Sequence, residues 1–294
     1  MGPVKIGLYI RLLGRPGTDP PPPSWPSIRD QARAAEAAGF DLVVLEDGLL
    51  YGTEPDVLGV WEGVTMAAAI AASTSSIGIA QAVMNSPYRY PGRVAAIATA
   101  LDEISGGRYT LGIGAGNTPD DYPRFGIESD PRYSRFAEAI EIIHGLLKSG
   151  RMSFQGSFYS VRDAELPLRG PSTGGPPISI AAGKPRMLRL AARFGDEWNW
   201  WTGNPGDLDE MRPLVYEADR ACEEIGRDPA SLRRSVDVFS IVSGGSADQA
   251  AETLRSYGSI GFAEVRCELQ PARGTSHLDA IEWMTAVVAR VRAP

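Results

Sequence analysis

Residues 178–194 read ISIAAGKPRMLRLAARF and contain a complete transition from a strand to a helix. Residues 178–182 form a short apolar run that is typical of a buried strand, and helical spacing of apolar residues begins after Pro185. Gly183 permits a tight turn between the two, and Pro185 is favourable in a first helical turn. A strand followed at once by a helix is the repeating unit of α/β folds, so the number of such units predicts the architecture.

The same unit recurs along the chain, and eight strand–helix pairs are expected in its 294 residues. The expected strands are residues 4–10, 41–46, 76–84, 108–114, 178–182, 197–201, 235–242 and 262–269. The expected helices are residues 25–40, 57–73, 92–105, 132–150, 187–194, 208–226, 247–258 and 278–292. Eight units predict an α/β protein with a (β/α)8 TIM barrel, and an open doubly wound sheet is the alternative.

Residues 151–176 interrupt this rhythm. Residues 152–161 are typical of a β-hairpin, and the glycine- and proline-rich residues 167–177 are typical of a loop. We therefore expect an insertion around residues 151–176. The sequence contains no internal repeat and no low-complexity linker, so we expect a single domain over residues 1–294.

Composition excludes several classes of partner. The formal net charge is −7 and the arginines are scattered, which argues against binding to nucleic acid or to an anionic membrane. No run of 18 apolar residues is present, so we expect no transmembrane helix. The two cysteines, Cys222 and Cys267, form neither a disulfide framework nor a zinc motif. The N-terminal residues run directly into a strand without a signal peptide, and we expect a cytoplasmic protein without a bound metal.

In a barrel the active site lies at the C-terminal ends of the strands, which identifies the residues to inspect. Asp47 follows the second strand directly and is the best-placed carboxylate, whereas Glu46 is expected to point the other way. Asn85 and Ser86 are polar residues at the end of the third strand. The glycines of GIGAGN, residues 112–117, either let a flat ligand lie on the strand ends or pack as small residues at the barrel mouth.

The start of the helix after Pro185 is a second place to inspect. A helix N-terminus offers unpaired N–H groups and a partial positive charge, and Lys184 and Arg186 add formal charge. Either a phosphate group binds there, or the segment is a tight turn with a solubilising lysine. In EWNWW, alternation places Trp198 and Trp200 on one side of the strand and Trp201 on the other. We expect at least one of the three to line a pocket and two to be structural.

Acid–base groups are sparse. His144 and His277 are interpreted as surface or packing residues, and no Ser–His–Asp set or metal cluster is evident. Inward strand positions show no convincing lysine or pair of carboxylates, which disfavours a cofactor-free isomerase or aldolase. This scarcity indicates that a cofactor carries the reaction, and a flavin-binding carrier or sensor without turnover is the other class to consider.

Three segments carry a resemblance to a known family: residues 82–91 (AVMNSPYRYP), 101–127 (LDEISGGRYTLGIGAGNTPDDYPRFGI) and 176–199 (PPISIAAGKPRMLRLAARFGDEWN). Together they resemble the bacterial luciferase-like monooxygenase superfamily, and in particular the branch that uses the deazaflavin coenzyme F420. The similarity runs in order over nearly the whole chain. It implies a (β/α)8 barrel with an insertion near the fifth strand, and often a dimer.

The resemblance also implies roles for individual residues. A non-prolyl cis peptide that backs the cofactor ring maps to Ala82 and Val83, and an acid near the polar edge of the ring maps to Asp47. The cofactor-binding residues that we predict are Asp47, Ala82, Val83, Asn85, Gly116, Asn117, Ala182, Gly183 and Lys184, the last three as a phosphate loop.

Two positions depart from the pattern that the resemblance implies. Several deazaflavin dehydrogenases carry a histidine base where this chain has Gly48, and some carry glutamate where it has Asn117. Either Tyr51, Glu54 or Tyr122 handles the proton, or the substrate is an activated acceptor that needs little acid catalysis. The candidates for a catalytic role are Asp47, Asn117 and Tyr122.

The sequence therefore predicts a cytoplasmic, homodimeric oxidoreductase that transfers a hydride between coenzyme F420 and an unidentified small organic substrate. The alternative is an FMN-dependent monooxygenase that uses reduced flavin and oxygen, because the same pocket suits both rings.

Overall fold

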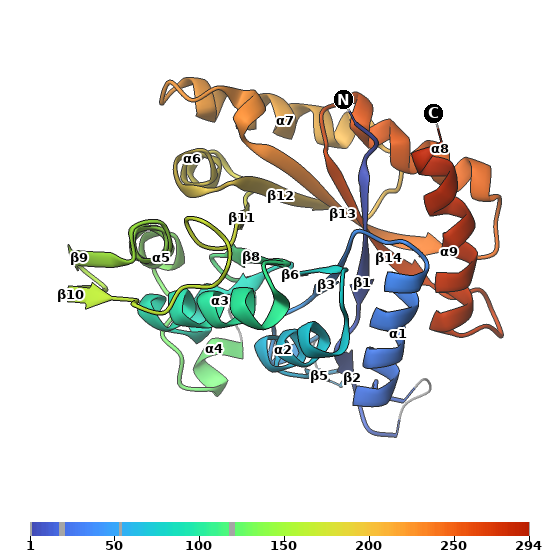
Figure 1. Cartoon of the computed structure of the whole chain (residues 1–294), viewed down its shortest axis with the longest axis horizontal. Coiled ribbons are helices and arrows are strands. Elements are labelled where there is room, and N and C mark those ends of the chain that lie inside the picture. The colour runs from blue at the N-terminus through green and yellow to red at the C-terminus, as the bar shows by residue number, and fades with distance from the viewer. Residues whose placement is uncertain (1, 18–20, 53–54, 118–120, 294) are drawn as a thin grey trace.

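A closed barrel of parallel strands forms the centre of the molecule (Figure 1). The computed structural model describes residues 2–17, 21–52, 55–117 and 121–293. The barrel strands are β1 (Lys5–Ile10), β3 (Leu42–Leu45), β6 (Gly78–Gln81), β8 (Tyr109–Gly114), β11 (Ile178–Ala181), β12 (Glu197–Thr202), β13 (Arg233–Val242) and β14 (Glu264–Gln270). Neighbours along this order pair in parallel, β14 pairs with β1, and β8 pairs with β11, which closes the barrel.

A helix follows each barrel strand and covers its outer side (Figure 1). These helices are α1 (Trp25–Ala37), α2 (Gly63–Ser73), α3 (Pro91–Ser105), α5 (Arg132–Ser149), α6 (Pro185–Phe194), α7 (Leu208–Glu223), α8 (Ala247–Ser259) and α9 (His277–Arg292). Caps recognisable in the sequence begin several of them. The Ser24 side chain accepts from the Ser27 amide at α1, and Ser276 and Asp279 form a capping box at α9. The predicted (β/α)8 barrel is confirmed, and among the described residues no helix is long and apolar enough to cross a membrane.

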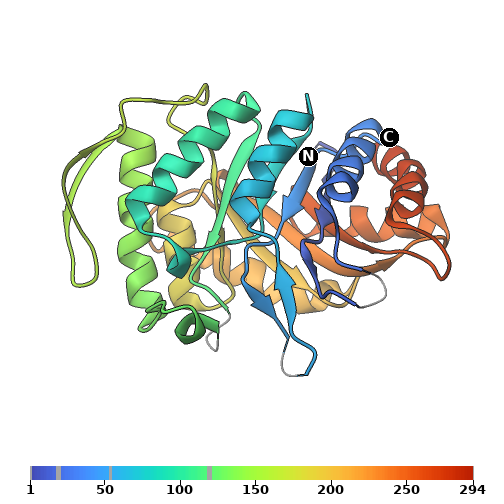
Figure 2. The same ribbon diagram turned by 90° about the horizontal axis from the view of Figure 1, so that it is seen from below.

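The predicted insertion is also present. β9 (Arg151–Gln155) and β10 (Ser160–Glu165) form an antiparallel hairpin that lies beside α5 at one edge of the molecule (Figure 2). Glu138 on α5 holds the hairpin turn, because its carboxylate accepts hydrogen bonds from the amides of Ser157, Phe158 and Tyr159 at 2.7 to 2.9 Å.

Two local expectations were wrong. The helix expected from residue 57 begins at Gly63, where the Glu62 carboxylate accepts from the Thr65 amide at 2.6 Å. The residues before it form β5 (Leu58–Val60), which joins β2 (Leu13–Gly14) and β4 (Leu50–Tyr51) in a small antiparallel sheet. An apolar run as short as residues 57–60 fits a strand as well as a helix, and pairing with β2 decides between them.

The strand expected over residues 76–84 is interrupted as well. β6 ends at Gln81, the Ala82–Val83 peptide bond is cis, and β7 (Met84–Asn85) then pairs with the end of β8. Short elements complete the described fold: the 3-10 turns η1 (Ser86–Tyr88) and η2 (Pro229–Ser231), and the single-turn helix α4 (Asp121–Arg124).

Alternation along the strands separates two environments. On β1, Ile6, Leu8 and Ile10 face the helices and belong to the main apolar core, whereas Tyr9 faces the barrel lumen. Tyr9 packs there with Leu42, Val44 and Ala80 in a second, smaller apolar cluster. The remaining inward positions carry many polar side chains, and their heights along the strands define the candidate site.

Candidate active site

Three charged residues meet at the upper end of the lumen, where the parallel strands end. β1 and β3 pair Ile10 with Leu45, so the residues that follow them, Arg11 and Glu46, lie side by side. The Nη1 atom of Arg11 lies 3.1 Å from Oε2 of Glu46. The Nε atom of Arg11 donates at 2.7 Å to Oε1 of Glu268, a residue of β14. We refer to Arg11, Glu46 and Glu268 as the upper charged layer.

Aromatic side chains surround this layer. The guanidinium carbon of Arg11 lies 5.7 Å from the ring centre of Tyr9 and 5.8 Å from that of Phe239. Trp201 packs against Phe239 with ring centres 6.0 Å apart and is 50% exposed. Of the three tryptophans of EWNWW, Trp201 is the one that contacts Phe239. The upper end of the lumen thus combines charged groups with an open apolar wall.

Alternation along the strand decides which of the two neighbouring carboxylates, Glu46 or Asp47, faces the lumen. The two side chains do point in opposite directions, as expected. Glu46, however, shares the inward side of β3 with Leu42 and Val44, so it is the carboxylate that enters the lumen. Counting inward positions along the second and eighth barrel strands would have found Glu46 and Glu268.

Asp47 lies behind the strand ends, in an ion pair. Its Oδ2 accepts from the Asn85 amide at 2.8 Å and from Nη1 of Arg89 at 2.6 Å, and its Oδ1 accepts from Nη2 of Arg89 at 2.9 Å. Arg89 also pairs with Glu62, the residue that caps α2. The Asp47 side chain is only 2% exposed, and in this structure it fixes the end of β7 at Asn85.

The glycines of residues 112–117 allow β8 to approach the bent end of β6. A Cβ atom on Gly112 would overlap the carbonyl oxygen of Gln81, and one on Gly114 would lie 2.9 Å from Cγ2 of Val83. Tyr9 donates from its hydroxyl to the carbonyl of Ala82, which holds the same segment from the lumen side. Small-residue packing, one of the two readings of this motif, is therefore present, and the cis peptide expected at Ala82–Val83 is confirmed.

Three other predicted residues are neighbours of this segment. Tyr122 is fully buried and donates from its hydroxyl to Oδ1 of Asn85 at 2.9 Å. Gly116 has a φ of +91°, and a Cβ there would overlap the Tyr122 hydroxyl, whereas Asn117 is exposed. Tyr122 is buried and bonded to Asn85, which gives it a positioning role rather than contact with a substrate.

The predicted phosphate loop begins helix α6. Lys184 is the N-cap residue and is exposed, and the indole nitrogen of Trp198 donates to the Ala182 carbonyl at 2.7 Å. A Cβ on Gly183 would overlap the ring of Trp200, so the glycine is required for packing. The amide groups at this helix start and the exposed Lys184 side chain are suited to an anion.

A second charged cluster lies lower in the lumen. Arg266 is 1% exposed; its Nη2 lies 2.6 Å from Oε1 of Glu197, its Nε 2.6 Å from Glu264, and its Nη1 3.8 Å from Asp237. We refer to Glu197, Asp237, Glu264 and Arg266 as the lower charged layer. The expectation that no set of carboxylates occupies inward strand positions was wrong. The side chains of this layer are at most 11% exposed, and Arg266 supplies the charge that offsets the repulsion between the three carboxylates.

Burial raises the pKa of Asp237 to about 7, although Arg266 opposes the shift. The folded state therefore keeps a proton that the unfolded state releases at lower pH, so this group lowers the free energy of unfolding as pH rises toward and through that value. Relative to the wild type, Asp237→Asn should gain about 2–3 kcal/mol in free energy of unfolding between about pH 5 and about pH 8. Urea unfolding at both pH values measures this gain, and an equal difference at the two would contradict it.

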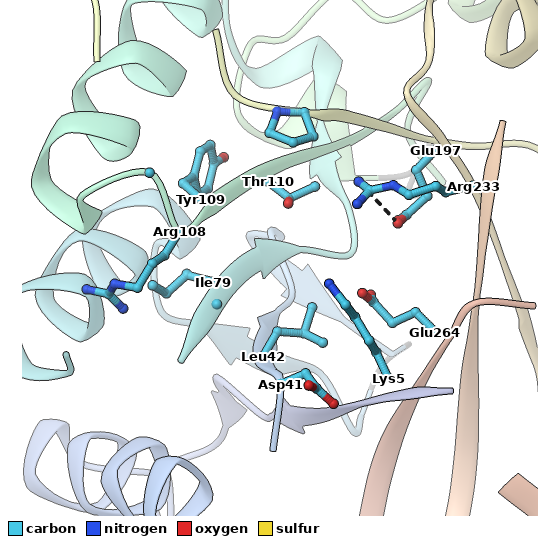
Figure 3. A pocket seen from close by; sticks show the side chains of 13 residues that line it. Lys5, Asp41, Leu42, Ile79, Arg108, Tyr109, Thr110, Glu197, Arg233 and Glu264 are labelled. Carbon is cyan, nitrogen blue, oxygen red and sulfur yellow. Dashed lines mark ion pairs between the residues drawn. The ribbon is translucent and has the colours of Figure 1, made fainter. Parts of the chain in front are cut away.

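A cavity of about 220 Å³ lies at the opposite end of the barrel, where the strands begin (Figure 3). Lys5 and Glu264 point into it side by side, and Arg233 lies 3.8 Å from Glu197, its register partner on the adjacent strand. In barrels this end serves stability, and the C-terminal ends of the strands carry the chemistry. The upper end of the lumen is therefore the candidate active site.

The remaining acid–base candidates do not belong to the upper charged layer or lie outside the described residues, although His277 is near enough to Glu268 for that carboxylate to oppose the fall that burial causes in its pKa. Tyr51 is 52% exposed on β4, and Glu54 lies outside the described residues. His144 packs against Phe194, and His277 is the first residue of α9. No group of three metal-ligating side chains occurs within the described part of the chain.

A closed (β/α)8 barrel with a charged, aromatic-lined upper mouth and a basic helix start at its rim has the architecture of a barrel enzyme. A family model, that of the luciferase-like monooxygenases, matches residues 4–290. The chain belongs to this family and is an enzyme of it.

Three known proteins illustrate the relationship. An F420-dependent hydroxymycolic acid dehydrogenase of Mycobacterium tuberculosis is 33% identical over 227 residues, which cover 76% of this chain and 61% of that protein. An F420-dependent glucose-6-phosphate dehydrogenase of Beutenbergia cavernae is 36% identical over 194 residues, which cover 62% of this chain and 55% of that protein. The chain thus spans about three fifths of the length of these relatives. An F420-dependent secondary alcohol dehydrogenase in complex with an F420–acetone adduct has the same fold, with a TM-score of 0.84, 17% identity and full coverage of both chains.

Proposed function

We propose that this protein is an oxidoreductase that transfers a hydride between coenzyme F420 and a small organic substrate at the upper end of the barrel lumen. The observation that carries the proposal is the joint placement of an aromatic-walled mouth and an exposed basic helix start, on a chain whose relatives include F420-dependent dehydrogenases. The cofactor supplies hydride exchange at its deazaflavin ring. The chain's residues bind and orient the cofactor and handle the accompanying proton.

The residues present fit such a cofactor. A phosphodiester group suits the amide groups at the start of α6, with Lys184 as a counter-ion. We propose that Ala82 and Val83 back the ring, because they join β6 to β7 at the mouth of the barrel. Asp47 and Tyr122 would act indirectly, since both hold Asn85 in place. Asn117 is exposed nearby, and we keep it and Gly116 as predicted contacts of the cofactor. Ala182 and Gly183 of the phosphate loop are predicted contacts as well.

An FMN-dependent monooxygenase is the rival function, because the family includes monooxygenases and FMN carries a similar ring and phosphate. Oxygen uptake separates the two, since a deazaflavin carries carbon where a flavin carries the nitrogen that supports reaction with oxygen. We expect no enzyme-dependent oxygen uptake with reduced F420. Enzyme-dependent uptake with reduced FMN, coupled to oxidation of an added substrate, would instead establish the rival function.

Replacing Lys184 tests the phosphate loop. We expect Lys184→Ala to weaken binding of oxidised F420 about 5- to 10-fold, because it removes one exposed counter-ion but leaves the amide groups in place. Lys5→Ala, at the far end of the barrel, is the matched control and should leave the Kd unchanged. Quenching of tryptophan fluorescence measures both values, and equal Kd values for Lys184→Ala and the wild type would place the phosphate elsewhere. Substitution of Gly183 is not a clean probe, because any side chain there meets Trp200.

We further propose a homodimer in a reducing cytoplasm. Support for the dimer comes from the family resemblance alone, and support for the compartment comes from two buried cysteines that are not joined in a disulfide. Sedimentation at low protein concentration tests the oligomeric state.

A further inference from the structure

Hydride transfer to or from a carbon–oxygen bond also moves a proton, and the structure must provide a group for it. Tyr122 is buried against Asn85, and Tyr51 is exposed on the small sheet. Glu46 and Glu268 both combine an inward position in the upper lumen with an ionisable group that still reaches solvent, at 13% and 15% exposure. Glu46 is the one of the two that follows a strand paired with β6.

We propose that Glu46 exchanges a proton with the hydroxyl or carbonyl oxygen of an uncharged substrate bound at the upper charged layer. The inference rests on the proposed function, because it assumes that hydride transfer takes place at this end of the lumen.

Hydrogen bonds hold the Glu46 carboxylate in place without using all of its acceptor positions. Its Oε1 accepts from the Leu12 amide at 2.7 Å and its Oε2 from Arg11 at 3.1 Å, which leaves further acceptor capacity on both oxygens. Glu46 directly follows Leu45, which pairs with Gln81 on β6, so it stands next to Ala82 on the neighbouring strand. A substrate in front of Ala82 and Val83 would therefore have Glu46 at its side.

The electrostatic surroundings suit a proton-transferring group. Burial raises the pKa of Glu46, the Arg11 charge and the Leu12 amide oppose the rise, and the Glu268 charge adds to it. Arg11 is shared between the two glutamates, so it neutralises neither completely. Tyr9 also faces this group, and burial raises the pKa of its hydroxyl well above the usual value, so it stays neutral. A carboxyl group whose pKa is raised toward neutrality is more effective in proton transfer near neutral pH.

Charge at the mouth selects the class of substrate. The upper charged layer holds one cation and two carboxylates, which disfavours a phosphorylated substrate beside it. Trp201 and Phe239 offer apolar contact instead. An uncharged alcohol or carbonyl compound fits this combination.

The step balances without a further reactant. In the oxidising direction, the O–H proton of the alcohol passes to Glu46, and the hydrogen of the neighbouring C–H bond leaves with its electron pair to the deazaflavin ring. The C–O bond then becomes C=O. In the reducing direction Glu46 returns the proton to the oxygen.

The test compares Glu46→Gln with Glu268→Gln, since both carboxylates bind Arg11 and only Glu46 is assigned the proton. The probe is propan-2-ol with oxidised F420, and glucose 6-phosphate is the charged comparator. We expect Glu46→Gln to lower kcat at least 100-fold with an unchanged Kd for F420, and to remove the acid limb of the pH profile of kcat. Glu268→Gln should lower kcat less than 10-fold and keep that limb. Retention of kcat and of the acid limb in Glu46→Gln, or a preference for glucose 6-phosphate, would overturn the proposal.

A second measurement does not depend on the choice of alcohol. Infrared difference spectra between wild type and Glu46→Gln, taken across a pH titration, report the carboxyl C=O band of protonated Glu46. We expect a band that persists to higher pH than for an exposed glutamate, and its absence would overturn the proposal. Failure of the wild type to bind F420 would contradict the proposed function instead, and the infrared result would then stand by itself as a property of Glu46.

Discussion

Replacing Arg266 by methionine should lower the free energy of unfolding by about 3–5 kcal/mol at neutral pH. Arg266 is the cation among Glu197, Asp237 and Glu264, and it is 1% exposed. Its removal takes away the buried cation that the three carboxylates share, whereas their burial cost remains. Because those carboxylates then bind protons more tightly in the folded state, the loss should be larger at about pH 8 than at about pH 5. Urea unfolding at the two pH values measures it.

Arg233→Met is the matched control for this prediction. Arg233 also approaches Glu197, at 3.8 Å, but its side chain is 46% exposed, so we expect a change of less than about 1 kcal/mol. If Arg266→Met is too unstable to isolate, the double variant with Glu264→Gln should be recovered more readily, because one buried charge is removed. Equal stability of Arg266→Met and the wild type would show that the lower charged layer does not stabilise the barrel.

Gly112→Ala should be the most damaging single-methyl change in the site. The new Cβ would overlap the carbonyl oxygen of Gln81, which belongs to the backbone and cannot rotate away. We expect a loss of about 3 kcal/mol in free energy of unfolding, at the upper end of the usual cost of overpacking. Because Gln81 directly precedes Ala82 and Val83, we also expect at least 10-fold weaker binding of F420.

Gly92→Ala is the control for adding a methyl group where no other atom is in the way. Gly92 lies in α3 with no atom within 4 Å of the position of its Cβ, and alanine is the better helix former, so stability should be unchanged or slightly higher. Urea unfolding and F420 titration of both variants complete the comparison. Wild-type stability and affinity in Gly112→Ala would mean that β6 can move without consequence for the site.

The sequence predicts the barrel well because each strand–helix unit carries its own local signal. The segment around Gly183 and Pro185 contains strand, turn and helix start within a few residues, and the structure begins α6 at Pro185. The same locality explains why the hairpin of residues 151–165 was predictable. Where a segment was short and its partner distant, as with β5 and β2, the local pattern predicted the wrong element.

The candidate site is less predictable because it depends on long-range neighbours. Arg11 and Glu268 are 257 positions apart in the chain, and no local pattern joins them. Only the register between β1 and β3, which pairs Ile10 with Leu45, shows that Arg11 and Glu46 stand at one height. The predicted acid Asp47 does follow the end of the expected strand, but its side chain points away from the lumen. A shift of one residue along a strand turns the side chain from the lumen toward the helices.

Equilibrium titration of the wild-type protein with oxidised F420, and in parallel with FMN, tests the central claim most directly. Both are followed by quenching of tryptophan fluorescence, to which Trp201 at the mouth contributes. We predict saturable micromolar binding of F420 that is at least 10-fold tighter than binding of FMN. Tight FMN binding without F420 binding would contradict the proposed cofactor and favour the monooxygenase, and binding of neither would contradict a cofactor site at this end of the barrel.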